Sequence, residues 1–364
     1  MTLMKTYLPV LSSVLLVATA ISLPCQAELK APLLPEETTN GKSTLAPLDP
    51  LQDQLAQNTA VLFNKKGLPA ATLTWVGADG YFITKASEVP RMEECQVHYA
   101  ARPHSAVREI RRDVKSDLVL GQAVTMRDVP AIQFQPSNGL TFGQWIASPA
   151  GGKHVKLGVV SANRRAIKGF GAAIGVRMDD QMKGKAKGVR IIGVAEDSPA
   201  AAAGLRANDI MLELAGESVQ EYRRVNEIIS QRQPGEEIEV KFKRNDTEKS
   251  LYVRLASRTK VLSNWEGEDF ANGGISIRTD NFSEVIQHDM PLHPTDMGGV
   301  VTDLLGHAIG INIARVDRVT TFALPTERFW PLIQEWMQKD RHPPKALPAT
   351  TASAAAPAAP TSNP

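Results

Sequence analysis

The chain has 364 residues, of which 43% are apolar and 22% charged, a composition that is ordinary for a soluble globular protein. Its formal net charge of +2 excludes a nucleic-acid binder that works through a strongly basic surface. The length allows two domains, and we expect no cofactor and no metal.

The first 27 residues have the pattern of an export signal. Lys5 precedes an apolar run from Leu8 to Leu23, which ends at Pro24-Cys25-Gln26-Ala27. We therefore expect a signal peptide that is cleaved after Ala27, and a periplasmic or secreted mature protein. Membrane association would follow only if the signal is retained as an anchor or if Cys25 is lipidated.

After the signal, the sequence predicts first a linker and then the first strands. Residues 28–50 are rich in Pro, Thr and Glu without periodicity, which predicts a solvated linker. A short helix leading into a strand is expected over Leu51 to Phe63. Ala71 to Val89 then predicts a hairpin, because two alternating apolar runs flank Ala78-Asp79-Gly80.

Three further strands are expected before the middle of the chain. Asp113 to Leu120 ends in an apolar run, and Phe142 to Pro149 and Leu157 to Ala162 are short apolar segments. They belong with the first hairpin to one β-rich unit.

A module with a different pattern follows from Gly171 to Arg258. Ser198-Pro199-Ala200 predicts the start of a short helix that ends at Gly204, and Val219 to Gln231 predicts a second helix. The predicted strands of the module cover Ala173 to Arg177, Val189 to Val194, Asp209 to Leu214, and two alternating runs around Ile238 and Val253 that are joined at Asn245-Asp246.

The pattern then returns to strands and ends in a helix. Strands are expected over Gly273 to Arg278 and Phe282 to His288, followed by a hairpin with strands at Gly299 to Asp303 and Ala308 to Ala314. Glu327 to Gln338 predicts a closing helix with an apolar stripe. Residues 341–364 are a Pro/Ala-rich tail that we expect to be disordered.

Three stretches resemble trypsin-like serine proteases of the HtrA/DegP type. Gly80, Tyr81 and Thr84 align with the hairpin that leads to the catalytic histidine of that family, and Ser87 stands in the place of the histidine. Asp117 matches the triad aspartate. The run around Met297, Thr-Asp-Met-Gly-Gly, matches the nucleophile loop Gly-Asn-Ser-Gly-Gly, with Met297 in the place of the serine.

These replacements predict a degenerate triad. A thioether cannot form an acyl-enzyme, and a serine hydroxyl cannot act as a general base near neutral pH. Thr295 replaces the first glycine of the loop, so the oxyanion hole is also affected. With no histidine to orient, Asp117 is expected to be a structural carboxylate. His288 and Asp289 are not expected to form a substitute pair, because neighbours on a strand point to opposite faces.

The middle module resembles a PDZ domain of the kind associated with bacterial proteases, as GVRIIGVAEDSPAAAAGLRANDIMLEL shows. Such a domain adds a peptide to a sheet edge and holds its terminal carboxylate on loop N–H groups. The resemblance implies that Ala173, Ile174, Gly175 and Val176 form the loop and strand. On the helix across the groove it implies Val225, Ile228 and Ile229, although helix spacing alone does not separate groove from core.

The expected fold is therefore mostly β, a trypsin-like double β-barrel with an inserted α+β PDZ domain. The expected divisions are a signal peptide (1–27), a linker (28–50), the first part of the protease homology (51–168), the PDZ domain (169–258), the second part of the protease homology (259–340) and the tail (341–364).

Three functions are compatible with this fold. The first is binding of exported proteins or peptides with hydrophobic C-termini, or of unfolded peptides, without cleavage. The second is an active serine-type endopeptidase of the HtrA type in periplasmic protein quality control. The third is a scaffold or chaperone-like subunit of an oligomer. Removal of both nucleophile and base costs about a millionfold in rate, which favours binding.

Overall fold

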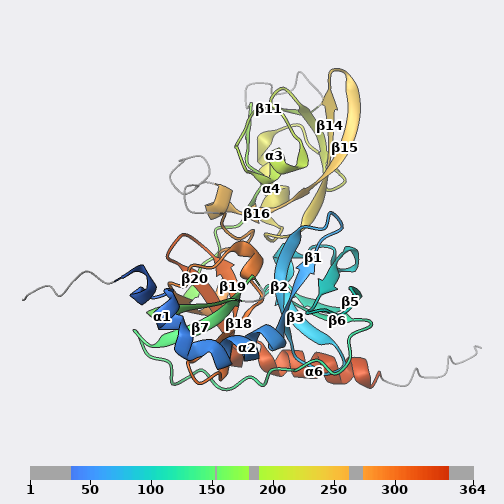
Figure 1. Cartoon of the computed structure of the whole chain (residues 1–364). Helices are drawn as coiled ribbons and strands as arrows, with labels where there is room; N and C mark the ends of the chain where they lie inside the picture. The colour runs from blue at the N-terminus through green and yellow to red at the C-terminus, as the bar shows by residue number, and fades with distance from the viewer. Residues whose placement is uncertain (1–33, 152–153, 180–187, 262–273, 344–364) are drawn as a thin grey trace, which may run out of the picture.

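The structure is a computed structural model that describes residues 34–151, 154–179, 188–261 and 274–343. Two closed β-barrels lie side by side, and a smaller domain stands on one end of the pair (Figure 1). The C-terminal helix lies at the opposite end. This arrangement confirms the predicted double barrel with an inserted α+β domain. The expected signal peptide, including Cys25, and residues 344–364 of the expected tail fall outside the described residues.

The first barrel closes through strands in the order β1-β2-β3-β6-β5-β4. Its predicted hairpin is confirmed, because β2 and β3 are joined by a turn in which Gly80 has a φ of +87°. Glycine reaches this backbone region at little steric cost. The strands are β1 (Thr59–Phe63), β2 (Pro69–Trp75), β3 (Tyr81–Lys85), β4 (Gln96–His98), β5 (Ser105–Asp113) and β6 (Leu118–Ala123).

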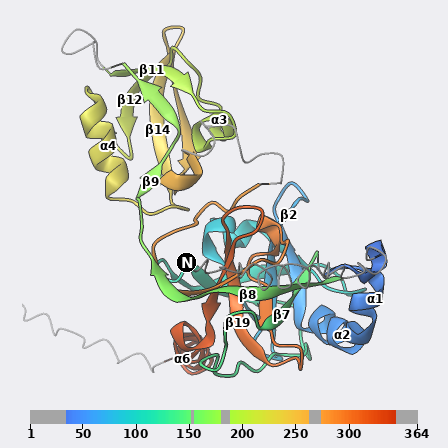
Figure 2. The ribbon, with the colours of Figure 1, turned by 90° about the vertical axis from the view of Figure 1, so that its left-hand side faces the viewer.

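The second barrel closes in the order β17-β20-β19-β18-β7-β8. The predicted hairpin near its end is confirmed as β18 and β19, with every residue of both strands buried. The long strand β8 runs across this barrel and leads directly into the inserted domain (Figure 2). The strands are β7 (Trp145–Ala150), β8 (His154–Ile167), β17 (Phe282–His288), β18 (Val300–Thr302), β19 (Ala308–Arg315) and β20 (Thr321–Pro325).

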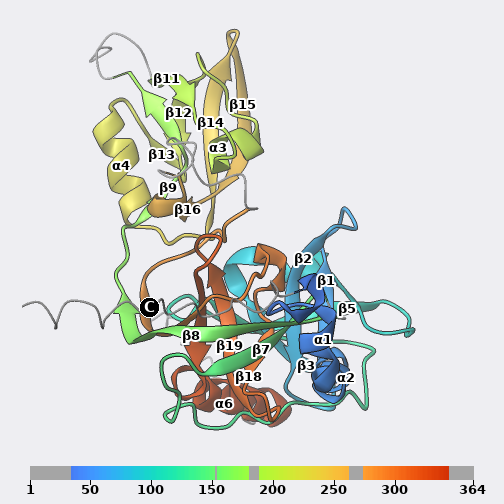
Figure 3. The same ribbon diagram turned by 60° about the vertical axis from the view of Figure 1, so that its left-hand side comes forward.

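The inserted domain, from β9 to β16, has its own apolar core. Its main sheet has the order β10-β11-β12-β14-β15, and β9 and β16 form a separate pair at its base (Figure 3). Its elements are β9 (Ala172–Ala173), β10 (Val176–Met178), β11 (Val189–Val194), α3 (Pro199–Ala203), β12 (Ile210–Leu214), β13 (Glu217–Ser218), α4 (Tyr222–Ser230), β14 (Glu237–Arg244), β15 (Thr247–Arg254) and β16 (Ala256–Ser257).

The local signals of the inserted domain explain its helices and turns. Ser198 caps α3, accepting a hydrogen bond from the N–H of Ala201 at 3.2 Å, and Gly204 ends the helix with a φ of +93°. Asn245 and Asp246, with φ of +49° and +62°, turn β14 into β15.

The expectation of a linker without regular structure is wrong for residues 34–50, although most of these residues are exposed as a solvated segment would be. This stretch forms short helices, and the side chain of Asn40 accepts a hydrogen bond from the N–H of Leu157 on β8 at 3.1 Å. Leu45 and Leu48 pack against the core that the two barrels share. The elements are η1 (Pro35–Glu37), α1 (Lys42–Leu45), η2 (Ala46–Leu48) and α2 (Asp49–Asn58), and β1 follows α2 as predicted.

The predicted strand over Gly273 to Arg278 is also wrong. Residues 274–281, which the structure describes, form an extended crossing without ladder pairing. Arg278 is almost fully buried there, and its guanidinium donates to the carbonyl oxygens of Lys115 at 2.9 Å and of Asp280 at 3.0 Å. These side-chain bonds, together with isolated backbone bonds from the N–H of Ser276 to the Arg315 carbonyl and from the N–H of Ser257 to the Ile277 carbonyl, each 2.9 Å, hold the segment in place of a strand ladder.

Helix α6 (Trp330–Arg341) closes the chain at the far end of the barrels, preceded by η7 (Thr326–Arg328). It begins three residues later than predicted, with Pro331 in its first turn. Asp340 accepts hydrogen bonds from the hydroxyl of Tyr81 and the guanidinium of Arg108, which fix the helix on the first barrel. Burial and this carboxylate raise the pKa of Tyr81 to about 12.

No helix in the described part of the chain has the length and apolar character needed to cross a membrane.

Candidate functional site

The loop that carries Met297 lies between β17 and β18 and contains the short helix η6 (Pro294–Asp296). The Met297 side chain has no exposed surface and belongs to an apolar cluster with Met290, Leu292 and Val301. A thioether in such a place is core filling. Met297 therefore presents no reactive group to solvent.

The backbone of this loop is folded onto itself. The N–H of Met297 donates to the carbonyl of Pro294 at 3.2 Å, and the N–H of Gly298 donates to the carbonyl of Asn312 at 2.8 Å. An oxyanion hole needs N–H groups that point at the ligand. Here the N–H groups at and after the nucleophile position are already bonded within the protein.

The same loop fastens the second barrel to the first. The N–H of Thr72 donates to the carbonyl of Met297 at 3.1 Å, and its hydroxyl donates to the carbonyl of Thr295 at 3.0 Å. The hydroxyl of Thr74 donates to the carbonyl of Gly298 at 2.8 Å. The loop that aligns with the nucleophile loop of the protease family therefore connects the two barrels through these hydrogen bonds.

Gly298 offers a test of how closely this joint is fitted. It has a φ of +92°, and an added Cβ would lie 2.1 Å from the carbonyl oxygen of Thr72. We expect Gly298→Ala to lower the free energy of unfolding by at least about 2 kcal/mol, as measured by urea denaturation. Gly139→Ala, which meets nothing within 4 Å, is the matched control. Equal stability of the two variants would contradict a closely fitted joint.

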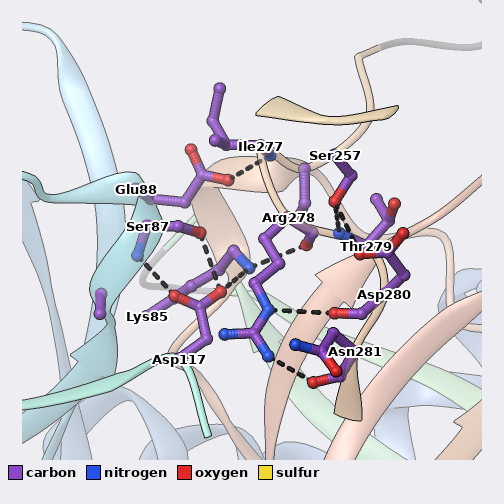
Figure 4. Close-up of polar contacts among 12 residues, drawn as sticks. Lys85, Ser87, Glu88, Asp117, Ser257, Ile277, Arg278, Thr279, Asp280 and Asn281 are labelled. Carbon is purple, nitrogen blue, oxygen red and sulfur yellow. Dashed lines mark hydrogen bonds and ion pairs between the residues drawn. The ribbon is translucent and has the colours of Figure 1, made fainter. Parts of the chain in front are cut away.

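Asp117 and Ser87 lie together in a buried polar cluster (Figure 4). The hydroxyl of Ser87 donates to Asp117 Oδ2 at 2.8 Å, and its N–H donates to Oδ1 at 2.8 Å. Lys85 Nζ lies 2.5 Å from Asp117 Oδ2 and also donates to the carbonyl of Arg278 at 3.0 Å. Both oxygens of the carboxylate are therefore engaged.

Lys85 is the member of this cluster that the sequence analysis missed. Its side chain has no exposed surface, and burial lowers its pKa while Asp117 opposes that shift. The available signal was a lysine at the end of an otherwise apolar strand, Tyr81–Lys85. In the structure the Asp117 carboxylate forms an ion pair with Lys85.

The inserted domain covers this cluster. The turn between α4 and β14 brings Gly235 so close to Ser87 that a Cβ on the glycine would lie 2.6 Å from the serine Cβ. Next to it, Glu237 forms an ion pair with Arg91 at 2.8 Å. A cavity of about 170 Å³ remains between this turn, Ser87 and Asp117. Ser87 itself is 3% exposed.

His288 and Asp289 point in different directions, as expected for neighbours on a strand. His288 is fully buried, and its Nε2 lies 2.9 Å from Asn312 Oδ1. Asp289 instead accepts a hydrogen bond from the N–H of Val159 at 2.7 Å. The two side chains do not form a catalytic pair.

The predicted groove residues of the loop and strand border the edge of the inserted domain's sheet. Ala173 ends β9, and Val176 begins β10, which is the terminal strand of the sheet order. Between them, Ile174 and Gly175 accept hydrogen bonds from the N–H groups of Ala200 at 2.8 Å and Ala195 at 2.9 Å, so the loop is held by its carbonyls.

The open side of β10 can be located from its bonds. The N–H of Asp179 donates to the carbonyl of Arg190 at 2.9 Å, that is, toward β11. Successive N–H groups along a strand alternate in direction. The N–H of Met178 therefore points away from β11, toward the edge where an added strand would lie.

The three predicted helix residues lie in the core of the inserted domain. Val225, Ile228 and Ile229 are 0%, 2% and 7% exposed and belong to its apolar cluster. Helix spacing alone allowed either a groove or a core position, and the structure places all three residues in the core. Tyr222 and Asn226 of the same helix are exposed instead.

Within the described ranges, His, Cys, Asp and Glu side chains do not gather in groups of three that could hold a metal ion.

Comparisons with known proteins agree with this architecture. The family model "PDZ domain" matches residues 172–255. The chain is 25% identical over 195 residues to a "Probable periplasmic serine endoprotease DegP-like" of Pseudomonas fluorescens, which covers 45% of this chain and 41% of that protein. It is 20% identical over 392 residues to a protein of the same name from Rickettsia conorii, with 76% of this chain and 77% of that protein covered.

The chain thus spans less than half the length of the first of these relatives. Among solved structures it is similar to the "HtrA-type protease AlgW with tripeptide", at 16% identity and a TM-score of 0.29, over 58% of this chain and 97% of that one.

Proposed function

The chain is a PDZ-containing relative of the HtrA/DegP-type serine proteases, and from this premise we propose that it is an exported protein that binds peptides or protein C-termini without cleaving them. Its ligands are exported proteins or peptides with hydrophobic C-termini, and its place of action is the periplasm. The name of both curated relatives, a periplasmic serine endoprotease, supports this location.

The observation that carries the proposal is the state of the position that would hold the nucleophile. Met297 is buried among apolar side chains, and its N–H is bonded to the carbonyl of Pro294. Met297 has no attacking atom, and its own N–H is already used within the loop and does not point at a ligand. The ion pair of Asp117 with Lys85 supports the same conclusion, because the aspartate is already neutralised by a neighbour.

The open edge of β10 supports peptide binding. A PDZ ligand extends a sheet as a further strand, which requires an edge strand with free backbone groups. β10 is such a strand, with the Met178 N–H directed outward.

The binding function is tested with free C-terminal peptides. We expect apolar C-terminal residues to give dissociation constants of about 10 μM or tighter, and the same peptides with amidated C-termini to bind far more weakly. Met178→Pro removes the outward N–H of β10 and should weaken binding about tenfold or more. Met178→Leu keeps that N–H and a similar side chain, so it is the matched control.

Gly175→Trp is not a suitable variant for this test. A side chain at Gly175 would place its Cβ 2.4 Å from the Cβ of Ser198, so Gly175→Trp would disturb the domain rather than block the groove alone. Fluorescence anisotropy with a labelled peptide measures all arms of the experiment. No binding across a broad peptide library would refute the binding function.

The alternative, an active endopeptidase of the HtrA type, is tested on the same purified protein. We expect no cleavage of casein or fluorogenic peptides above a mock purification. Cleavage that disappears in Asp117→Ala, with folding verified by circular dichroism, would reverse the proposal.

A further inference from the structure

A second cavity lies between the first barrel and the PDZ domain. It has a volume of about 570 Å³ and is lined by the β1–β2 turn, the segment after β3, the loop residue Thr295, and the PDZ residues Ala202 and Arg254. It is separate from the open edge of β10. Its walls carry four cations, namely Lys65, Lys66, Arg91 and Arg254, and three carboxylates.

The carboxylates of the cavity are already occupied. Glu94 forms an ion pair with Lys65 at 3.1 Å. Glu237 forms one with Arg91 at 2.8 Å. Glu88 accepts a hydrogen bond from a backbone N–H at 3.0 Å. The acidic groups are thus bonded to partners other than Arg254.

Arg254, at the end of β15, has no such partner. Its Nε and Nη2 are buried, and no atom of the described residues makes a hydrogen bond to either. Nor does any described carboxylate lie within ion-pair distance of this guanidinium. Burial lowers the pKa of Arg254, and Glu88, Asp117 and Glu237 counter this only as more distant charges.

An uncompensated charge of this kind is costly. A buried guanidinium without a bonded counter-ion loses hydration and gains no direct Coulomb attraction in return. Carboxylate and phosphate oxygens are the groups that match its planar donors. The cavity beside it has room for a small ligand of this type, and Lys66 adds a second cation to the same walls.

We propose that this cavity binds a small oxyanion, a carboxylate or a phosphate, whose charge compensates Arg254. Because the walls come from both the first barrel and the PDZ domain, the bound anion strengthens the contact between these two parts. For the anion to bond Nε or Nη2, the Arg254 side chain has to rotate toward the cavity, because both atoms are enclosed in this structure.

The test uses the thermal unfolding of the mature protein with sodium succinate and, separately, sodium phosphate, each at constant ionic strength set by chloride. At about 100 times the dissociation constant, the preferred anion should raise the unfolding temperature by about 5 °C. The two arms distinguish a carboxylate ligand from a phosphate ligand.

Arg254→Met is the decisive variant. Without anion it should be as stable as the wild type or more stable, since an unpaired charge is replaced by an apolar side chain of similar length. With anion it should show no shift. Arg206→Met, at an exposed position of the same domain, is the matched control and should keep the full shift.

Two outcomes would overturn the proposal. One is the absence of a shift in the wild type with either anion. The other is an equal shift in Arg254→Met. If Arg254→Met fails to fold, Lys66→Met replaces it, and the half-saturating anion concentration should then rise by about threefold or more. An unchanged value would count against the site.

Discussion

Replacing Asp117 with asparagine is expected to lower the free energy of unfolding by about 3–5 kcal/mol. The change removes the negative charge 2.5 Å from Lys85 Nζ and leaves a buried ammonium group without a counter-ion. Lys85 has no exposed surface, so water cannot take over the role of the carboxylate. Equilibrium urea denaturation measures the loss.

Asparagine is the appropriate substitute for two reasons. Asp117 has a φ of +58°, a region that asparagine tolerates better than most residues. Its amide oxygen can still accept the hydrogen bond from the Ser87 N–H. The measured effect therefore reports mainly on charge.

The double variant Lys85→Met with Asp117→Asn provides the control. It removes both charges, and most of the lost stability should return, because a well-packed apolar side chain can replace one half of a buried pair. A single variant that costs less than about 1 kcal/mol, or a double variant no better than the single, would mean that the pair is not the main contributor.

The second large effect is a loss of stability in mild acid that is due to His288. Burial lowers the pKa of His288 from an ordinary 6.5 to about 4. The unfolded chain binds a proton near pH 6.5, while the folded protein does so only near pH 4. The stabilisation is therefore complete above pH 6.5 and falls by about 3 kcal/mol as the pH decreases to 4.

The hydrogen bonds of His288 explain why its neutral form is preferred. The Asn312 amide nitrogen donates to Ser148 Oγ at 2.6 Å, so Oδ1 is the atom that faces His288 Nε2 and must accept. His288 Nδ1 accepts from the N–H of Met290 at 3.4 Å. A proton on Nδ1 would replace this acceptor with a second donor.

Denaturation curves between pH 7 and pH 4 test the effect. His288→Gln should remove the part of the pH dependence that falls in this window, whatever its own effect on stability. His154→Gln, at an exposed histidine of β8, is the matched control for the substitution itself. Identical pH profiles for wild type and His288→Gln would assign the acid sensitivity to other groups.

Local patterns predicted the hairpins and the inserted domain well. The turns at Gly80, Gly204 and Asn245-Asp246 each require a left-handed backbone, and glycine or asparagine marks them in the sequence. β17 and β11 match their predicted bounds because apolar alternation and flanking turn residues define both ends.

Long-range polar contacts were beyond such patterns. Lys85 and Arg278 are buried cations that each bond to residues distant in the chain, and the bond between Lys85 and the Arg278 carbonyl joins residues 193 positions apart. A single sequence carries no periodic signal for a pairing of that kind. The same holds for Asn40, whose bond to β8 gives order to a stretch with the composition of a linker.

The groove helix shows a different limit. Val225, Ile228 and Ile229 have the spacing of one helix face, and both a groove and a core produce that spacing. Which of the two applies depends on what the helix face packs against. Here it packs in one apolar cluster with residues of strands β11 and β14, and the sequence of the helix itself contains no information about those strands.

The PDZ domain interrupts the second barrel between two strands that are direct neighbours, since Phe282 of β17 pairs with Ile167 of β8. Within the domain, β9 and β16 join its two ends, with Ala173 opposite Ala256. A PDZ domain that folds first would therefore bring the two halves of the barrel together. The effective loop between β8 and β17 shortens by roughly two doublings, which saves about 1 kcal/mol of closure entropy. Mutations that slow folding of the PDZ domain should consequently delay the formation of a barrel that they do not touch.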